Sequence, residues 1–293
     1  MTTQYLDWVR DTRQARVPAP ALTCDCAVHI YRPKGVGTLT ANRRYDPPQA
    51  SIEDLERVHA AMGVQRAVIV QASIYGTDPT VMLEALRRAP DRYRGIAVID
   101  DSVTDAQMQD MHDAGVRGAR FNLLSRFGTA FDARVFQRDV DRVAAMGWSV
   151  SLHATVPELK EKQALIEAIR CPVILDHVAY FFDPADGNQA RDVDFLRTFT
   201  DRGNWWIKIS RMDRYVRAPY DAVVETVGRL VRAAPERTLW ATDWPHVLYP
   251  AGDAVVPNDT DLIELMFRCV PDAQLRENLL VHNPARLFDF PEA

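Results

Sequence analysis

The amino-acid sequence predicts an α/β fold, a single (β/α)8 TIM barrel. Short apolar runs alternate with longer amphipathic segments along the 293-residue chain, and eight of the runs have the character of strands. No internal repeat, low-complexity tract or interior linker divides the chain. We expect an N-terminal extension over residues 1–20 and one barrel domain over residues 21–293, with the active site at the carboxyl-terminal ends of the strands.

The expected strands are mostly continuous apolar runs. Segments such as AVIVQ and PVILD are typical of parallel strands, which are buried on both faces. The eight expected ranges are 22–30, 66–71, 93–99, 115–122, 149–153, 173–176, 205–209 and 238–242.

The segments between the strands have helical patterns. Ser51, followed by acidic residues, is typical of a helix N-cap. Further helices are expected over 79–88, 104–114, 133–145, 157–169, 190–201, 220–233, 259–269 and 272–280. An open doubly wound sheet is the alternative fold. The sequence disfavours it because no G-x-G-x-x-G or G-x-x-x-x-G-K-[ST] loop follows an early strand.

The composition argues against several classes of partner. The chain is 47% hydrophobic and 26% charged with a formal net charge of −5, which disfavours binding to nucleic acid. The first twenty residues carry charged side chains throughout, so we expect no signal peptide. No apolar run approaches the roughly 18 residues that a membrane helix needs. We therefore expect a small-molecule ligand and neither nucleic acid nor a membrane as partner; the oligomeric state is not predicted.

The cysteines favour a reducing environment. Four cysteines in a chain of this length do not make a disulfide framework, so we expect a cytoplasmic location. Cys24 and Cys26 could in principle bind a metal ion. No second Cys-x-Cys or Cys-x-x-Cys motif completes a four-sulfur site, so we interpret them as strand residues.

Polar side chains occur at the carboxyl-terminal ends of four expected strands. His29 ends the first strand and His153 the fifth, while His177 and Asp243 follow the sixth and the eighth. One such histidine alone is more often a structural residue, but four coincident placements favour a functional site. Long segments also follow strands 1, 6, 7 and 8, at the end of a barrel where active sites are built.

Arginines are expected at the same end of the barrel. Arg120 lies on the fourth strand, Arg126 follows it, and Arg214 follows the seventh strand. Guanidinium groups bind carboxylates in a bidentate manner, so the cluster favours an anionic ligand over the alternative of solvated surface charges. Tyr45 and Ser73 follow the first two strands and are candidate hydrogen-bond donors to the same ligand.

Six motifs carry a resemblance to a known family. They are the D-x-[H]-x-H position of the first strand, VIVQAS at 68–73, RGARFN at 117–122, ILDH at 174–177, WATDWPH at 240–246 and NPARLF at 283–288. With these motifs the chain resembles the amidohydrolase superfamily (amidohydrolase family 2) over nearly its whole length. Within it, the chain is similar to the lactonases of the 2-pyrone-4,6-dicarboxylate hydrolase and sulfomuconolactone hydrolase groups. The TDWPH segment is the most specific of these motifs.

The resemblance implies a role for each matching residue. Asp243 is implied to be the general base that activates water, with His177 and His29 facing the lactone carbonyl and its developing oxyanion. His246 is implied to help to position Asp243 without itself binding the substrate. The residues implied to bind the substrate are Arg120, Arg126, Arg214, Tyr45, Ser73 and His153.

Two positions depart from the family pattern. Ala27 replaces the first histidine of the superfamily's H-x-H pair, so a complete metal clip cannot form on the first strand. His153 stands where the pyrone-dicarboxylate hydrolases carry tyrosine, as in metal-dependent relatives. No lysine at the end of the fourth or fifth strand could bridge two metals. We therefore expect at most one divalent ion, zinc by preference, or none. Its candidate ligands are His29, His153, His177 and Asp243.

The resemblance implies a hydrolase that opens a small carboxylated lactone. Candidate substrates are 2-pyrone-4,6-dicarboxylate and muconolactone-type compounds formed in aromatic degradation. One alternative is a metal-dependent decarboxylase of the same superfamily. The other is an inactive or substrate-trapping form, because Ala27 interrupts the H-x-H pair.

Overall fold

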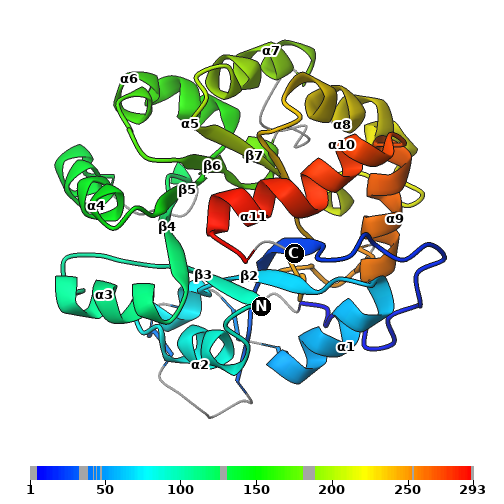
Figure 1. Cartoon of the computed structure of the whole chain (residues 1–293), viewed down its shortest axis with the longest axis horizontal. Helices are drawn as coiled ribbons and strands as arrows, with labels where there is room; N and C mark the ends of the chain where they lie inside the picture. The colour runs from blue at the N-terminus through cyan, green and yellow to red at the C-terminus, as the bar shows by residue number, and fades with distance from the viewer. Residues whose placement is uncertain are drawn as a thin grey trace.

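The computed structural model is an eight-stranded barrel surrounded by helices (Figure 1). It describes residues 5–32, 39–41, 43, 45–46, 48–125, 131–180, 189–252 and 254–291, with backbone only for 189–193. All strand pairs are parallel and follow the chain order from β1 to β8. The two ends of the sheet meet where the backbone N–H of His29 donates to the carbonyl of Trp244 at 2.8 Å. The predicted (β/α)8 fold is confirmed.

Each strand lies within its predicted range, and β5 and β7 have the predicted bounds. The eight strands are β1 Cys24–Val28, β2 Arg66–Val70, β3 Tyr93–Ala97, β4 Val116–Asn122, β5 Ser149–His153, β6 Val173–Leu175, β7 Trp205–Ile209 and β8 Thr238–Trp240. The interior of the barrel is filled by apolar side chains such as Val68, Ile96, Ile174 and Leu239, all fully buried. Because that core is filled, a ligand can reach only the ends of the barrel.

The helices alternate with the strands on the outside (Figure 1). In the described residues they are α1 Ile52–Met62, α2 Thr80–Arg88, α3 Asp105–Asp113, α4 Ala133–Ala145, α5 Val156–Glu161, α6 Gln163–Glu167, α7 Gln189–Thr200, α8 Asp221–Ala233, α9 Asp259–Cys269, α10 Ala273–Glu277 and α11 Asn283–Phe288. Ser51 caps α1 as predicted, with its side chain accepting a hydrogen bond from the backbone N–H of Asp54 at 3.1 Å. None of these helices has the length and apolar character needed to span a membrane.

Two helical predictions need correction. The helix expected over 157–169 is divided into α5 and α6, because Lys162 leaves the helical backbone region at φ −102° and ψ 14°. The last expected helix does not stop at residue 280. A π-helical turn over Asn278–His282 continues into α11, so helical structure extends to Phe288.

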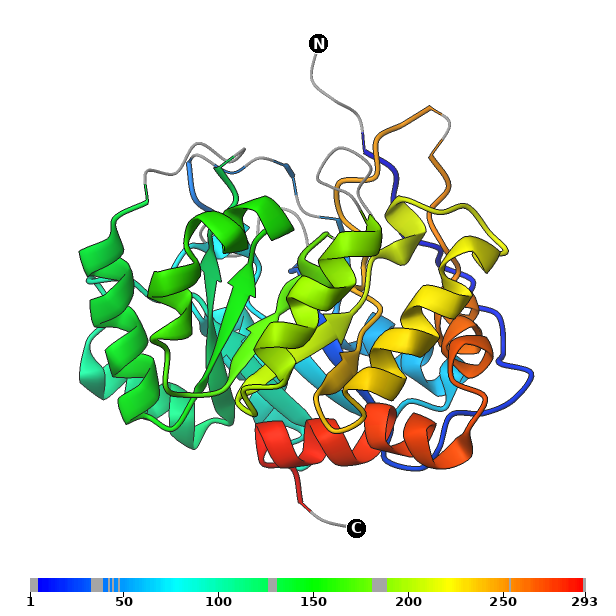
Figure 2. The same cartoon turned by 90° about the horizontal axis from the view of Figure 1, so that it is seen from above.

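The C-terminal helices close the amino-terminal end of the barrel, which we call the floor. Figure 2 shows α10 and α11 (red) lying across this end, whereas the segment between β8 and α9 (orange) rises at the opposite end, which we call the mouth. Arg94 of β3 donates from Nε to the carbonyl of Phe288 at 3.0 Å, and Phe288 itself is fully buried. The segment that contains α10 and α11 therefore covers the floor of the barrel.

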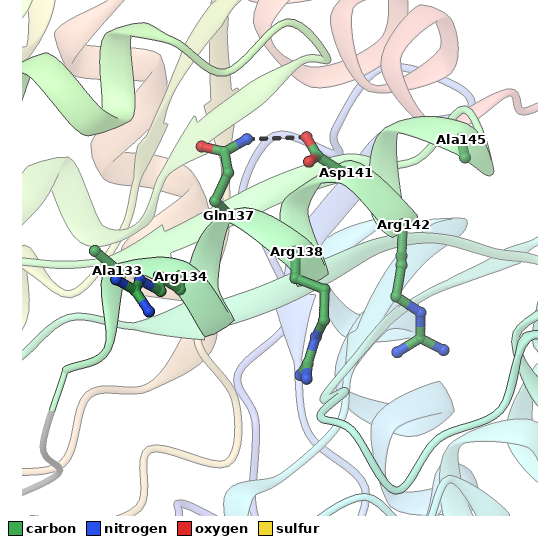
Figure 3. Close-up of a pocket in the computed structure, with 7 residues that line it drawn as sticks. All are labelled: Ala133, Arg134, Gln137, Arg138, Asp141, Arg142 and Ala145. Atoms are coloured by element: carbon green, nitrogen blue, oxygen red, sulfur yellow. Dashed lines mark hydrogen bonds between the residues drawn. The ribbon is translucent and has the colours of Figure 1, made fainter.

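A shallow depression on α4 is an ordinary helix surface (Figure 3). The Gln137 side chain donates to Asp141 Oδ1 at 2.9 Å along the outer face of the helix. Every residue that lines the depression belongs to α4: Ala133, Arg134, Gln137, Arg138, Asp141, Arg142 and Ala145. Because it is built from the exposed face of one helix, we assign no function to it.

Candidate active site

Asp243 is the centre of a charged cluster at the mouth. Its Oδ1 lies 3.5 Å from Nε2 of His29 and 3.9 Å from Nε2 of His177. Its Oδ2 lies 3.1 Å from Nη1 of Arg211. The four side chains follow β8, β1, β6 and β7, so neighbouring strand ends bring them together. Three of the four were predicted site residues; Arg211 was not.

Asp243 is held in its ionised form. Only 3% of the residue is exposed, and this burial by itself raises the pKa of the carboxyl group. Arg211, His177 and His29 together outweigh burial and hold the pKa of Asp243 well below its usual value. A buried carboxylate that stays ionised at neutral pH can accept a proton from a bound water.

The backbone after β6 takes an unusual left-handed turn. Four successive residues, His177, Val178, Ala179 and Tyr180, have φ between 50° and 55°. Each non-glycine residue in this region costs roughly 1–2 kcal/mol, so tertiary contacts must hold the turn. One such contact joins His177 Nδ1 and Ser210 Oγ at 2.8 Å. The turn directs both His177 and Tyr180 towards the cluster.

His177 is neutral. Burial, opposed by Asp243 and aided by Arg211, lowers the pKa of its imidazole to about 3. His29 is anchored differently: because a carbonyl oxygen can only accept, His29 Nδ1 donates to the carbonyl of Val70 at 2.8 Å. In both residues Nε2 is the atom that faces Asp243.

His153 lies beside His177, with ring centroids 5.4 Å apart. Its Nε2 is hydrogen-bonded to the hydroxyl group of Tyr180. Burial lowers the pKa of His153 well below its usual value, and the nearby His177 and Arg120 lower it further. His153 is therefore neutral, and its imidazole lines the site beside His177.

The two arginines after β7 lie in different places. Arg211 has a left-handed backbone at φ 63° and pairs with Asp243. Arg214 instead donates to the backbone carbonyls of Val247 and Leu248, the latter at 2.9 Å, and covers the ring of Tyr249. Burial and the charge of Arg211 lower the pKa of Arg214 to about 9. Sequence reasoning selected Arg214 and missed Arg211, although both stand in the same S-R-M-D-R segment.

The remaining predicted residues differ in their burial and in their contacts. Arg120 is half-buried on β4. Its charge lowers the pKa of Tyr45, but the burial of Tyr45 has the larger effect and the net pKa is raised to about 12. The Tyr45 hydroxyl is hydrogen-bonded to that of Tyr31 at 2.7 Å. Ser73 is exposed at the start of a short 3-10 turn. Arg126 lies outside the described residues.

His246 lies behind the loop that carries Asp243. Its Nε2 is 2.8 Å from Oδ1 of Asp259, at the beginning of α9, and both residues are buried. Burial lowers the pKa of His246, but Asp259, aided by Asp213 and Asp243, outweighs burial, so the net pKa is raised. This contact ties the β8 loop to α9, so the predicted supporting role of His246 would act through the backbone.

The N-terminal segment packs against the same loop. The backbone N–H of Leu6 donates to the carbonyl of Tyr249 at 2.8 Å, and the rings of Trp8 and Trp244 meet edge to face at 5.0 Å. A cavity of about 190 Å³ opens between this segment and the loops after β1 and β8. It is lined by Tyr5, Leu6, Asp7, Tyr45, Asp46, Pro48, Pro245, Val247 and Leu248.

The donor set in the described residues does not fit a metal centre. No group of three or more histidine, cysteine, aspartate or glutamate side chains among them is arranged to hold an ion. Ala27 is buried and offers no ligand atom, and His153 Nε2 is bonded to Tyr180. The Arg211 cation lies against Asp243, where a metal ion would compete with it.

Comparison with known proteins connects this site to a family. The amidohydrolase family model matches residues 24–290. A 2-pyrone-4,6-dicarboxylate hydrolase from Comamonas testosteroni is 32% identical over 302 residues, covering 99% of this chain and 97% of that protein. A 4-sulfomuconolactone hydrolase from Rhizobium radiobacter is 33% identical over 267 residues, covering 90% of this chain and 89% of that protein.

A solved structure agrees with the fold. The apo crystal structure of an Agrobacterium tumefaciens protein superimposes with a TM-score of 0.76 at 27% identity, covering 94% of this chain and 98% of that one. The match of the family model to most of the chain, together with these relatives, leads to one conclusion: the protein is a hydrolase that belongs to the amidohydrolase family.

Proposed function

We propose that the protein hydrolyses a small carboxylated lactone, such as 2-pyrone-4,6-dicarboxylate or a muconolactone-type compound, in the degradation of aromatic compounds. The relatives that are 32% and 33% identical over nearly the whole chain have names of this kind. The observation that carries the proposal is the buried, ionised Asp243 between two imidazoles and a guanidinium. Lactone hydrolysis needs such a base, because it must deprotonate an attacking water.

In the proposed reaction Asp243 takes a proton from water while the water oxygen attacks the lactone carbonyl. The negative charge that develops on the carbonyl oxygen needs a hydrogen-bond donor. His177 can supply one from Nε2 when the Ser210 hydroxyl donates to its Nδ1, a contact of 2.8 Å. The ring C–O bond then breaks, and the leaving oxygen receives the proton that Asp243 took. One water is consumed and one carboxylic acid is formed.

Arg120 is our leading candidate for binding a substrate carboxylate. It is half-buried at the mouth, beside the paired hydroxyls of Tyr31 and Tyr45. Arg214 keeps its predicted role in a weaker form, because the carbonyls of Val247 and Leu248 already use two of its nitrogens. Arg126, Ser73 and His153 remain candidates for the other contacts.

The test is a panel of lactones with and without carboxylate groups, assayed in ¹⁸O-labelled water with and without a chelator. We expect the carboxylated pyrone or muconolactone to be opened with one labelled oxygen in the new carboxyl group and one acid released. Release of carbon dioxide with strict metal dependence would instead favour the decarboxylase. Binding of the carboxylated compounds without turnover of any would favour the inactive form that Ala27 suggests.

We also propose a cytoplasmic location. All four cysteines are free and buried, including Cys24 and Cys26 on the same strand. Free thiols are typical of proteins in a reducing compartment. Fractionation of the native host with an antibody would test this proposal, and recovery in an extracytoplasmic fraction would contradict it.

A further inference from the structure

A buried network joins β1 to the segment that carries the catalytic carboxylate. Asp25 of β1 is fully buried and lies opposite Thr242, the residue immediately before Asp243. Asp25 Oδ1 accepts hydrogen bonds from the backbone N–H of Thr242 at 3.0 Å and of Ala27 at 3.3 Å. Its Oδ2 accepts one from the Thr242 hydroxyl at 2.5 Å.

The Thr242 hydroxyl extends the network past Asp243. While it donates to Asp25, its oxygen accepts from the backbone N–H of Trp244 at 3.0 Å. The residues on both sides of Asp243 are thus held through one carboxylate and one hydroxyl. Asp243 itself donates its N–H to the carbonyl of Ala27 at 3.1 Å.

Such a restraint has a physical purpose at this position. Asp243 has φ 65°, in the left-handed region that aspartate tolerates better than most non-glycine residues but still enters at a cost, so hydrogen bonds on both sides help to hold it. An error of about 1 Å in the position of a catalytic group can cost about a hundredfold in rate. His59 of α1 places Nε2 3.5 Å from Asp25 Oδ2, so a buried imidazole also faces the carboxylate.

We propose that Asp25 is a positioning residue, which acts through Thr242 to fix the backbone of Asp243 and the direction of its carboxylate. The hydrogen bonds to Thr242 and onward to Trp244 carry this inference. It rests on the proposed function only in taking Asp243 as the base. The contact between β1 and the segment after β8 therefore orients Asp243 as well as closing the barrel.

The test compares three threonine variants in β8 and the segment that follows it. Thr242→Val removes the hydroxyl with little change in shape, whereas Thr242→Ser keeps it. Thr238→Val is the matched control, because Thr238 is equally buried on β8 and its hydroxyl has no hydrogen-bond partner among the described residues. Asp25→Asn, which changes one acceptor oxygen into a donor, tests the other end of the network.

Two readouts are measured for each variant: kcat and KM on the lactone, and amide hydrogen exchange at residues 242–244. For Thr242→Val and Asp25→Asn we expect kcat to fall about 10- to 100-fold with KM little changed, and exchange at these amides to accelerate. Thr242→Ser and Thr238→Val should resemble the parent in both. Equal impairment of Thr242→Ser and Thr242→Val, or unchanged kcat and exchange in Thr242→Val and Asp25→Asn, would overturn the proposal.

The failure of the proposed function gives a different result. If the parent opens no lactone, the proposed function fails, and the exchange readout still decides whether Asp25 restrains the Asp243 backbone. If the parent is active, Asp243→Asn is inactive and the Thr242→Val and Asp25→Asn variants keep the parent kcat, only the positioning inference is wrong.

Discussion

The two ends of the barrel use the same residue types for different purposes. At the floor, arginines bind the backbone of the chain's own C-terminal end, as Arg94 does with the carbonyl of Phe288 at 3.0 Å. At the mouth, Arg211 pairs with the buried carboxylate of Asp243, the proposed base, at 3.1 Å. Arg117 and Arg120 lie three residues apart on β4, yet Arg117 contacts Asp289 at the floor, at 3.4 Å, and Arg120 lies at the mouth.

The aspartates show the same contrast. Asp243 and Asp289 both have left-handed backbones, at φ 65° and 56°. Asp289 is exposed just after α11, whereas Asp243 is buried among three basic side chains. The comparison teaches that the environment of a charged residue depends on its burial and on the end of the barrel where it lies, rather than on residue type or local backbone conformation.

The largest expected effect is on Asp243. Asp243→Asn should lower kcat by about a hundredfold or more, because the variant cannot accept a proton from water. Asn tolerates the left-handed region, so the backbone should persist. Asp289→Asn makes the same change at the floor and should leave kcat unchanged; kcat is measured for both. Retention of more than half of the parent rate by Asp243→Asn would remove Asp243 from the mechanism.

The second effect concerns substrate charge. Arg120→Met should reduce kcat/KM for a dicarboxylated lactone about 10- to 100-fold, the value of a lost charged hydrogen bond. A neutral lactone should lose much less. Arg117→Met, on the same strand but at the floor, should affect both substrates equally and slightly. If Arg120→Met also affected both substrates equally, Arg120 would be structural.

The third effect is on pH dependence. As the proposed base, Asp243 acts only when ionised, so we expect activity to be lost as the pH falls through its pKa. Burial raises that pKa and Arg211 is the main group that lowers it, so Arg211→Met should raise it. The acid limb of the kcat/KM profile should therefore move to higher pH, as measured on the free enzyme. An acid limb at the parent position would show that Arg211 does not control the ionisation of Asp243.

The smallest effect on activity is expected at the floor. Arg94→Met leaves the carbonyls of Phe288 and Asp289 without their donor, so it should lower the free energy of unfolding by about 1–3 kcal/mol. Urea unfolding measures this loss, while kcat of the folded enzyme should equal that of the parent. A fall in kcat without a loss of stability would mean that the floor and the mouth are coupled.

The local sequence determined the fold and part of the site. Apolar runs long enough to be strands, Ser51 before a helix, and polar residues at strand ends sufficed to predict the barrel and the convergence of His29, His177 and Asp243. This succeeds because parallel strands in a barrel all end at one mouth, so order along the chain translates directly into proximity.

Tertiary structure alone decided the direction of individual side chains. Arg211 and Arg214 stand in one short segment, and the left-handed backbone at Arg211 turns its guanidinium towards Asp243 while Arg214 binds two loop carbonyls. The tie from Asp25 through Thr242 spans 217 residues of sequence. Left-handed turns at non-glycine residues are locally unfavourable, so local sequence preferences do not predict them; they exist because distant contacts hold them.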